Sequence, residues 1–324
     1  MSDFDLGFRS TATRLEGEAN RRAALTNRSL AFNVCYLDDC CRALMPHDLV
    51  IIAAKTGAGK TTLAEIIGTT NAAQGKRVHY FALEAEPDEI ERHLKYRWIV
   101  RMALKRGHDI RGMTYPDWYL DRYDERLGTL TSEADRVIAS EYKTLSTYYR
   151  ARDFTHADIK RLFLAIRNDT DLIILDHLHY VDAMDGTIEN ASQKEIVKVI
   201  RDCALAIGVP IVVVAHLRKR ATRKTLLPEV DDVMGSSDIV KPATRVILVA
   251  PALDKAPVGS LYPTYMAVEK DRLCGASRYV AQIDYDIRAG RYGDGYYLGT
   301  IDMMGESFQT MDMATNAPAW ARRW

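Results

Sequence analysis

The sequence lacks an apolar run long enough to cross a lipid bilayer, and it shows no secretory signal peptide. It is also poor in cysteine, and its five cysteines are an odd number without the spacing of metal ligands: Cys35, Cys40, Cys41, Cys203 and Cys274. These absences argue against a membrane-spanning protein and against a disulfide-stapled secreted domain. We therefore expect an intracellular protein with reduced thiols and no contact with a membrane.

An excess of charge of either sign is absent as well, because 44 basic residues balance 44 acidic ones. A protein that coats nucleic acid over its whole surface needs a basic excess, so any nucleic-acid contact of this chain must come from a local patch. With 324 residues, the chain suits one large domain or two small ones with a sizeable buried core.

What the sequence does contain is the stretch LVIIAAKTGAGKTT at residues 49–62, which is typical of a strand, a phosphate-binding loop and a helix. It fits the pattern G-x-x-x-x-G-K-[ST] with one departure, since Ala54 stands at the first position. In such a loop, backbone N–H groups bind phosphate oxygens, Lys60 reaches the β- and γ-phosphates, and the hydroxyl of Thr61 ligates Mg²⁺. The alternative is a glycine-rich turn with an incidental lysine. We predict that ATP contacts Lys55, Thr56, Gly57, Ala58, Gly59, Lys60, Thr61 and Thr62.

Three further apolar runs end in polar residues, namely Glu84, Asp176 and His216. Ligands collect beyond the carboxyl ends of parallel strands, so we expect these side chains near the nucleotide. Glu84 is either the base that deprotonates the attacking water or a solvated glutamate. Asp176 matches the acid that holds Mg²⁺, and His216 is placed to hydrogen-bond a γ-phosphate. His177 and His179 alternate beyond Asp176, but without a third ligand at suitable spacing we do not expect a metal site there.

A basic run follows His216 and has two interpretations. It is either a solvated turn or, beside an ATP site, a loop that contacts nucleic acid. The residues concerned are Arg218, Lys219, Arg220, Arg223 and Lys224.

The order of PHDLVIIAAKTGAGKT, HYFALE, LIILDHL and PIVVVAHLRKR resembles the RecA-fold motor domain of the hexameric replicative helicases, the DnaB-like family that includes phage primase-helicases. The resemblance runs from about residue 32 to residue 292. It implies an α/β fold, a doubly wound and mostly parallel sheet flanked by helices, of the P-loop NTPase class. It also implies that Glu84 is the catalytic carboxylate, that Asp176 is the Walker B acid, and that His216 occupies the sensor position.

The segment EKDR at residues 269–272 follows an expected strand at residues 265–268. It resembles the family segment in which a lysine and an arginine two residues later reach into the ATP site of a neighbouring subunit. Lys270 and Arg272 are therefore candidates for catalysis in trans, and the alternative is an exposed hairpin charge.

We expect three parts: an arm or linker at residues 1–45, a motor domain at 46–298 and a tail at 299–324. In the arm, residues 11–30 are a helical candidate that is either a mobile tail or a segment packed on a neighbouring subunit. Only about 45 residues precede the expected core, which leaves no room for the primase domain or the helical collar of larger relatives.

The sequence thus predicts an ATP- and Mg²⁺-dependent enzyme that forms a ring, expected to be a homohexamer, and moves on single-stranded DNA, with a loader or primase as a further partner. We expect it in the cytoplasm of a bacterial or phage-infected cell. Two other functions stay open: a RecA-fold recombination or repair ATPase that forms filaments, and a regulatory ATPase that is not a motor. Unwinding of a forked duplex separates the first function from the others.

Overall fold

The computed structural model describes residues 10–54, 58–110, 113–123, 127–150, 152–181, 189–217, 225–229, 232, 240–275, 277, 279–313 and 315–321; of residues 189–192 it describes the backbone. Within this part of the chain, eleven strands form one sheet, with β9 attached to the side of β8 and the others in the order β11-β10-β8-β7-β6-β1-β5-β4-β2-β3. No helix in the described ranges is both long enough and apolar enough to span a bilayer.

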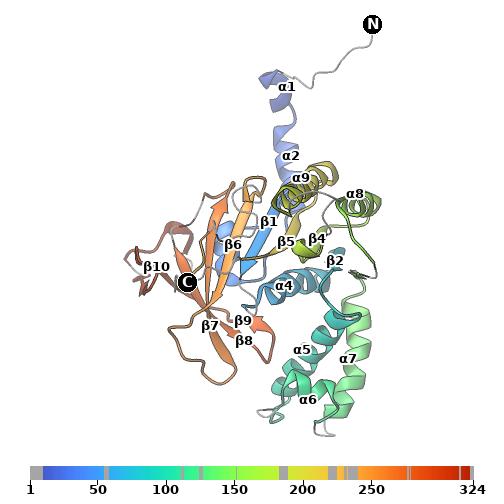
Figure 1. Cartoon of the computed structure of the whole chain (residues 1–324), viewed down its shortest axis with the longest axis vertical. Coiled ribbons are helices and arrows are strands. Elements are labelled where there is room, and N and C mark those ends of the chain that lie inside the picture. The colour runs from blue at the N-terminus through green and yellow to red at the C-terminus, as the bar shows by residue number, and fades with distance from the viewer. Residues whose placement is uncertain are drawn as a thin grey trace.

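Six neighbouring strands of this sheet are parallel, and they form the doubly wound block predicted from the sequence (Figure 1). Short apolar runs flanked by helices favour this arrangement, because a parallel sheet needs crossover connections and burial on both faces. The strands are β1 (Leu49–Ala54), β2 (Val78–Ala82), β3 (Leu145–Tyr149), β4 (Leu172–Asp176), β5 (Ile211–His216) and β6 (Arg245–Pro251).

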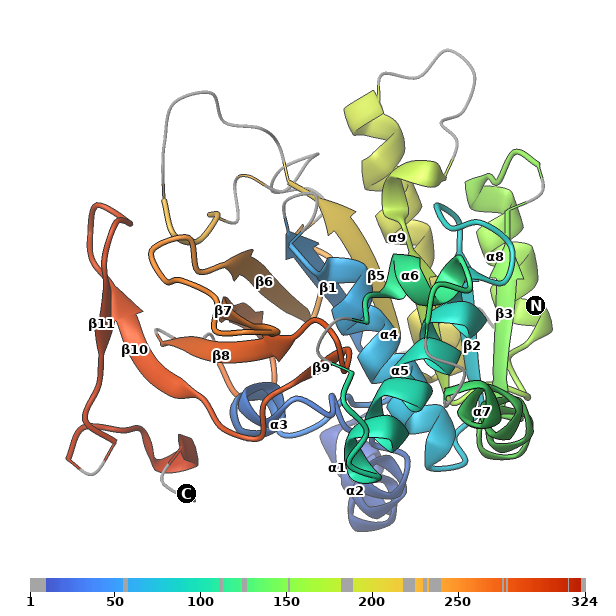
Figure 2. The ribbon, with the colours of Figure 1, turned by 90° about the horizontal axis from the view of Figure 1, so that it is seen from below.

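Beyond β6 the sheet continues with antiparallel strands, which end at β11, far from β3 at the other edge (Figure 2). These strands are β7 (Leu261–Asp271), β8 (Val280–Asp286), β9 (Arg291–Tyr292), β10 (Tyr297–Ile301) and β11 (Phe308–Thr310). The expected boundary between motor domain and tail at residue 298 falls inside β10. Residues after the expected boundary therefore extend the sheet.

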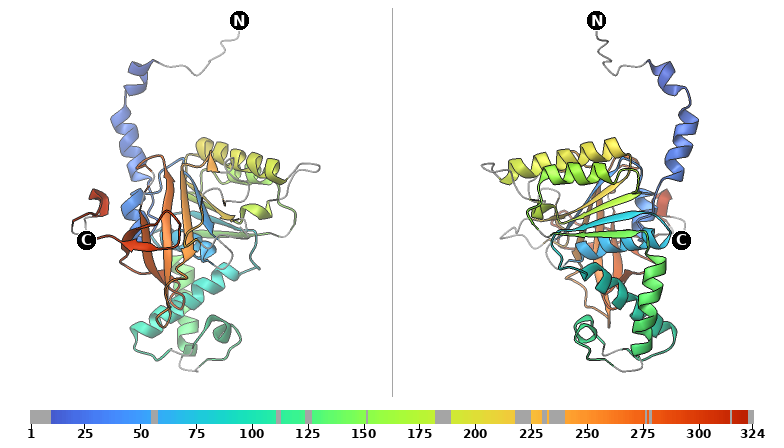
Figure 3. Two further views of the ribbon diagram at one scale, coloured as in Figure 1. Left: turned by 60° about the vertical axis from the view of Figure 1, so that its left-hand side comes forward. Right: turned by 90° about the vertical axis from the view of Figure 1, so that its right-hand side faces the viewer.

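Helices cover both faces of the sheet (Figure 3). On one face, α3 (Cys35–Cys41) and α4 (Lys60–Ala73) share a core with Val50, Ile52 and Ala54 of β1. On the other face, α8 (His156–Ala165) and α9 (Glu189–Ile207) share a core with Leu49, Ile51 and Ala53. Because side chains alternate along a strand, β1 is buried on both sides, which explains its unbroken apolar sequence.

A helical unit lies below α4 and has its own core. It consists of α5 (Glu89–Lys105), α6 (Tyr115–Tyr119) and α7 (Gly128–Glu141). β3, which pairs with β2 at the edge of the sheet, is not among the strands expected from the sequence. The residues of β3 are only partly buried, so the strand lacks the apolar run by which the inner strands were recognised.

The amino-terminal residues divide into two parts at about Leu30. Before it, α1 (Thr11–Leu15) and α2 (Glu18–Asn27) form an exposed arm that projects from the body (Figures 1 and 3). The single helix expected over residues 11–30 is interrupted at Gly17, whose φ of 68° lies in the left-handed region. From Leu30 onward the chain enters the main core, where Tyr36 packs against Trp320.

Candidate nucleotide site at the carboxyl ends of the parallel strands

Four predicted site residues lie at one edge of the sheet because the strands that carry them are parallel neighbours. His216 ends β5 in register with Ala54 of β1, and Asp176 ends β4 in register with Ala82 of β2. Glu84 follows two residues after β2, and Lys60 begins α4 after the phosphate loop. The topology therefore brings Lys60, Glu84, Asp176 and His216 together from four separate segments.

The described part of the phosphate loop ends at the N-terminus of α4. Gly59 has a φ of 82°, so this position favours glycine, which turns the chain into the helix without strain. Lys60 follows with only 7% of its surface exposed, and the first N–H groups of the 14-residue helix are available to bind an anion. Lys55, Thr56 and Gly57 lie outside the described residues.

Asp176 is 4% exposed and is held from two sides. Thr61 donates its hydroxyl hydrogen to one carboxylate oxygen at 3.3 Å, and Tyr80 donates to the other at 2.8 Å. Burial raises the pKa of Asp176 to about 7, although Tyr80 and Thr61 oppose this shift. A hydroxyl and a carboxylate side by side are the oxygen ligands that Mg²⁺ prefers, so this pair fits the ion implied by the phosphate loop.

Three histidines gather beside this carboxylate. The ring centroids of His177 and His216 are 3.7 Å apart, and His179 lies 5.2 Å from His177. Burial lowers the pKa of His177 to about 2 and that of His179 to about 4, and the proximity of His216 and of the Lys60 cation lowers each pKa further. Burial, followed by Lys60, also lowers the pKa of His216. The imidazoles are therefore neutral at pH 7, and each has a ring nitrogen whose lone pair can bind a cation.

Next to Lys60 and Thr61 lies a cavity of about 410 Å³ that the sequence did not predict. Its walls are rich in tyrosine, including Tyr262, Tyr285 and Tyr292 from β7, β8 and β9. Aromatic rings beside a phosphate site suit a nucleobase, which stacks on them. The available signal was the repeated tyrosine in three successive strands, but only the antiparallel pairing shows that these rings share one wall.

A buried charge network joins α4 to the helical unit and was also missed. Glu65 of α4 is 1% exposed and pairs with Arg97 and His93 of α5, the latter at 2.9 Å. Burial alone would raise the pKa of Glu65, but Arg97 and His93 outweigh it, so that the pKa is lowered. Gly290 leaves room for this arginine, because a Cβ there would lie 2.2 Å from its Nε atom.

Lys270 and Arg272 lie near the amino-terminal end of β1, on the side of the sheet opposite the carboxyl ends of the parallel strands. Asp271 pairs with Arg245, which pairs with Val50 near the start of β1, whereas the phosphate loop follows the end of β1. Lys270 donates to the backbone oxygens of Val240 and Lys241, each at 2.9 Å. Its pKa is lowered by burial and by the positive charge of Arg272. The structure thus does not bring this pair to the phosphate loop of its own chain.

The basic run at Arg218, Lys219, Arg220, Arg223 and Lys224 lies outside the described residues, so its role stays a prediction.

Both the sequence and the structure are similar to those of known proteins. Residues 30–274 match the family described as "DnaB-like helicase C terminal domain". The structure superposes with a TM-score of 0.69 on a solved structure described as an "ATPase Domain", at 13% identity, covering 88% of this chain and 98% of the other. It superposes with a TM-score of 0.68 on a chain from "The Structure Of A DnaB-Like Replicative Helicase And Its Interactions With Primase", at 14% identity, covering 81% of this chain and 62% of that one. No curated protein sequence matches this chain.

Proposed function

This chain belongs to the DnaB-like helicase C-terminal domain family, and we propose on that basis that it hydrolyses ATP between the subunits of a homohexameric ring that moves along single-stranded DNA and unwinds duplex. The observation that carries this proposal is the convergence of four strand ends and the N-terminus of α4 on one site. Such a site binds phosphate through Lys60 and backbone N–H groups, and it carries a carboxylate near the reacting group.

We assign the roles as follows. Lys60 neutralises charge on the β- and γ-phosphates, and Thr61 and Asp176 hold Mg²⁺. Glu84 orients and deprotonates the attacking water, since its exposed side chain extends from the end of β2 into the same site. His216 contacts the γ-phosphate and relays its presence to the adjacent basic run, which contacts DNA. The tyrosine-lined cavity takes the nucleobase and ribose.

Lys270 and Arg272 supply positive charge to a neighbouring subunit's ATP. Their position at the far edge of the sheet supports a role in trans, because in a head-to-tail ring one edge of each subunit faces the opposite edge of the next. A site completed by two subunits also explains how hydrolysis can be coordinated around a ring. The arm formed by α1 and α2 has no buried residue of its own, which suits a segment that packs on a neighbour.

A primase or a loader is the further partner that we propose, since one of the matched structures concerns a DnaB-like replicative helicase and its interactions with primase. Binding of purified primase to the assembled ring tests this directly. A ring that binds neither protein would contradict it.

The test of the proposed function is unwinding of a forked DNA duplex with ATP and Mg²⁺, with the Lys60→Ala protein as the control for contaminating helicases. We expect strand separation by the wild type only, together with ATP hydrolysis stimulated by single-stranded DNA. Stimulated hydrolysis without unwinding would instead favour a recombination or repair ATPase. Hydrolysis that does not respond to DNA would favour a regulatory ATPase.

A further inference from the structure

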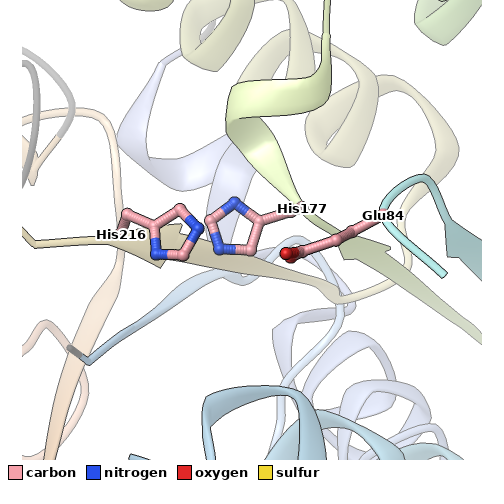
Figure 4. Close-up of side chains that lie close together, drawn as sticks. All are labelled: Glu84, His177 and His216. Atoms are coloured by element: carbon pink, nitrogen blue, oxygen red, sulfur yellow. The ribbon is translucent and has the colours of Figure 1, made fainter. Parts of the chain in front are cut away.

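Glu84, His177 and His216 form a cluster whose potential ligand atoms all lie within 4.8 Å of one another. The three residues come from the ends of three neighbouring strands, β2, β4 and β5. Figure 4 shows the imidazole rings of His177 and His216 facing each other, with the carboxylate of Glu84 directed toward the ring of His177 from the other side. His179, although close by, does not belong to this cluster.

The buried histidine of the cluster has an unused ligand atom. His177 is 0% exposed, and its Nε2 atom has no hydrogen-bond partner among the described residues. The Nδ1 atom of His177 lies 3.3 Å from Nδ1 of His179, so this nitrogen has a hydrogen-bond partner. A buried polar atom without a partner is rare, and it suggests an unobserved ligand.

We propose that Glu84, His177 and His216 bind a transition-metal dication such as Zn²⁺, and that the bound ion inhibits ATP hydrolysis. Two imidazoles and a carboxylate are ligands typical of zinc, whereas Mg²⁺ prefers oxygen ligands alone. Three protein ligands leave a fourth position for water, as in open zinc sites. This site is distinct from the Mg²⁺ position, whose ligands are Thr61 and Asp176.

Closing around the ion requires the three ligand atoms to approach one common point and the imidazole rings of His177 and His216, whose centroids are 3.7 Å apart, to move apart. Tetrahedral Zn²⁺ with bonds of about 2.1 Å holds its ligand atoms roughly 3.4 Å apart. In the structure, the potential ligand atoms of the three residues lie within 4.8 Å of one another. Glu84 is exposed and His216 is only partly buried, so both side chains can move relative to the ring of His177. His177 is thus the fully buried member of the site, and Glu84 and His216 are the more exposed members.

Inhibition rests on the proposed function, in which Glu84 accepts a proton from the attacking water. A carboxylate whose lone pair is bound to a metal ion no longer accepts that proton, and a metal-bound imidazole of His216 cannot contact the γ-phosphate. Occupation of the site is therefore expected to stop hydrolysis without displacing ATP.

Binding is tested on the full chain, freed of metal by a chelator, by titration with Co²⁺ in the absence of nucleotide. The visible absorption of four-coordinate Co²⁺ reports the site, and Zn²⁺ should displace it at one ion per chain. His177→Ala should weaken binding at least about 100-fold, because even residues outside the coordination shell change metal affinity by about 10- to 100-fold. His108→Ala, which removes a histidine that follows α5 and has no part in the cluster, is the matched control and should bind within about threefold of the wild type. Equal binding by the His177→Ala and wild-type proteins would overturn the proposal.

A second pair of variants avoids the buried position. Glu84→Gln should weaken Co²⁺ binding by about tenfold or more, whereas Glu86→Gln, two residues further along the same exposed segment, should not. Equal affinities of these two proteins would remove Glu84 from the site.

The inhibitory effect is measured as ATP hydrolysis at saturating Mg²⁺ with increasing Zn²⁺, each protein being compared with its own zinc-free rate. We expect inhibition of the wild type and the His108→Ala protein over the concentration range in which Co²⁺ is displaced. Full activity of a zinc-loaded wild type would overturn the inhibitory role. Absence of hydrolysis without zinc would contradict the proposed function instead, and the Co²⁺ titration would then still decide whether the metal site exists.

Discussion

The position of Arg272 predicts that two inactive variants restore each other. One protein carries Arg272→Ala with an intact Lys60, and the other carries Lys60→Ala with an intact Arg272. Arg272 donates its backbone N–H to Thr244, which in turn donates to Leu49 at the start of β1. From Leu49 to Ala54 the strand rises by about 16 Å, at about 3.3 Å per residue, before the phosphate loop begins. The arginine therefore does not reach its own chain's γ-phosphate, and a catalytic role for it would have to be exerted on a neighbour's ATP.

The size of the recovery follows from this arrangement. Loss of an arginine that stabilises the transition state lowers the rate by about 10³ to 10⁵. When the two proteins are mixed in equal amounts and exchange subunits at random, about a quarter of the interfaces combine an intact Lys60 with a neighbour's intact Arg272. Independent interfaces would then restore up to about a quarter of wild-type ATP hydrolysis, and strict coordination around the ring would lower this value.

The assay is steady-state ATP hydrolysis of each variant alone and of the mixture, with fluorescence energy transfer between labelled subunits to establish exchange. A double variant that carries both substitutions on one chain, mixed with either single variant, is the matched control because no intact interface can form. A mixture that exchanges subunits but stays as inactive as its components would refute the assignment in trans.

Four further predictions concern residues whose roles differ. Lys60→Ala should abolish ATP hydrolysis because the phosphates lose their neutralising charge, and normal turnover would reject the phosphate-loop assignment. Glu84→Gln should keep ATP binding, measured with a fluorescent nucleotide, but should lower turnover by about 10² or more, with Glu86→Gln as the control. Glu65→Ala should lower the free energy of unfolding at pH 7 by about 3–5 kcal/mol, because Arg97 loses its buried partner. Since the pKa of Glu65 is lowered from 4.5, the stability that its charge provides is complete above pH 4.5 and is lost as the pH falls through the lowered pKa. The difference in free energy of unfolding between the wild type and the Glu65→Ala protein, measured by denaturant titration, should therefore shrink in acid. A pH-independent difference would contradict this. When alanine replaces Arg218, Lys219 and Arg220, the slope of log affinity for single-stranded DNA against log salt concentration should flatten by about 0.7 for each phosphate neutralised by these side chains, and an unchanged slope would indicate a solvated turn.

The sequence by itself determined the inner strands of the parallel block, but not its edge strand β3, and it also determined the polar residues at the carboxyl ends of those strands. The apolar runs at β1, β4 and β5 are local signals, and the glycine pattern before Lys60 sets the order of strand, loop and helix. Once the strands are taken as parallel, Glu84, Asp176 and His216 must share one edge, because all carboxyl ends of parallel neighbours point the same way. The common direction of the strands places these residues without reference to side-chain packing, so the sequence alone carries the information.

Tertiary structure alone decided the contacts between segments far apart in the chain. The approach of His177 to Glu84 and His216 depends on which side chains leave the strand ends on the same side, and sequence spacing carries no information on it. The position of Arg272 on the edge opposite Lys60 likewise follows from the register of β7 on β6 and of β6 on β1. Such registers are fixed by the burial of many residues at once, and no single short stretch of the sequence carries that information.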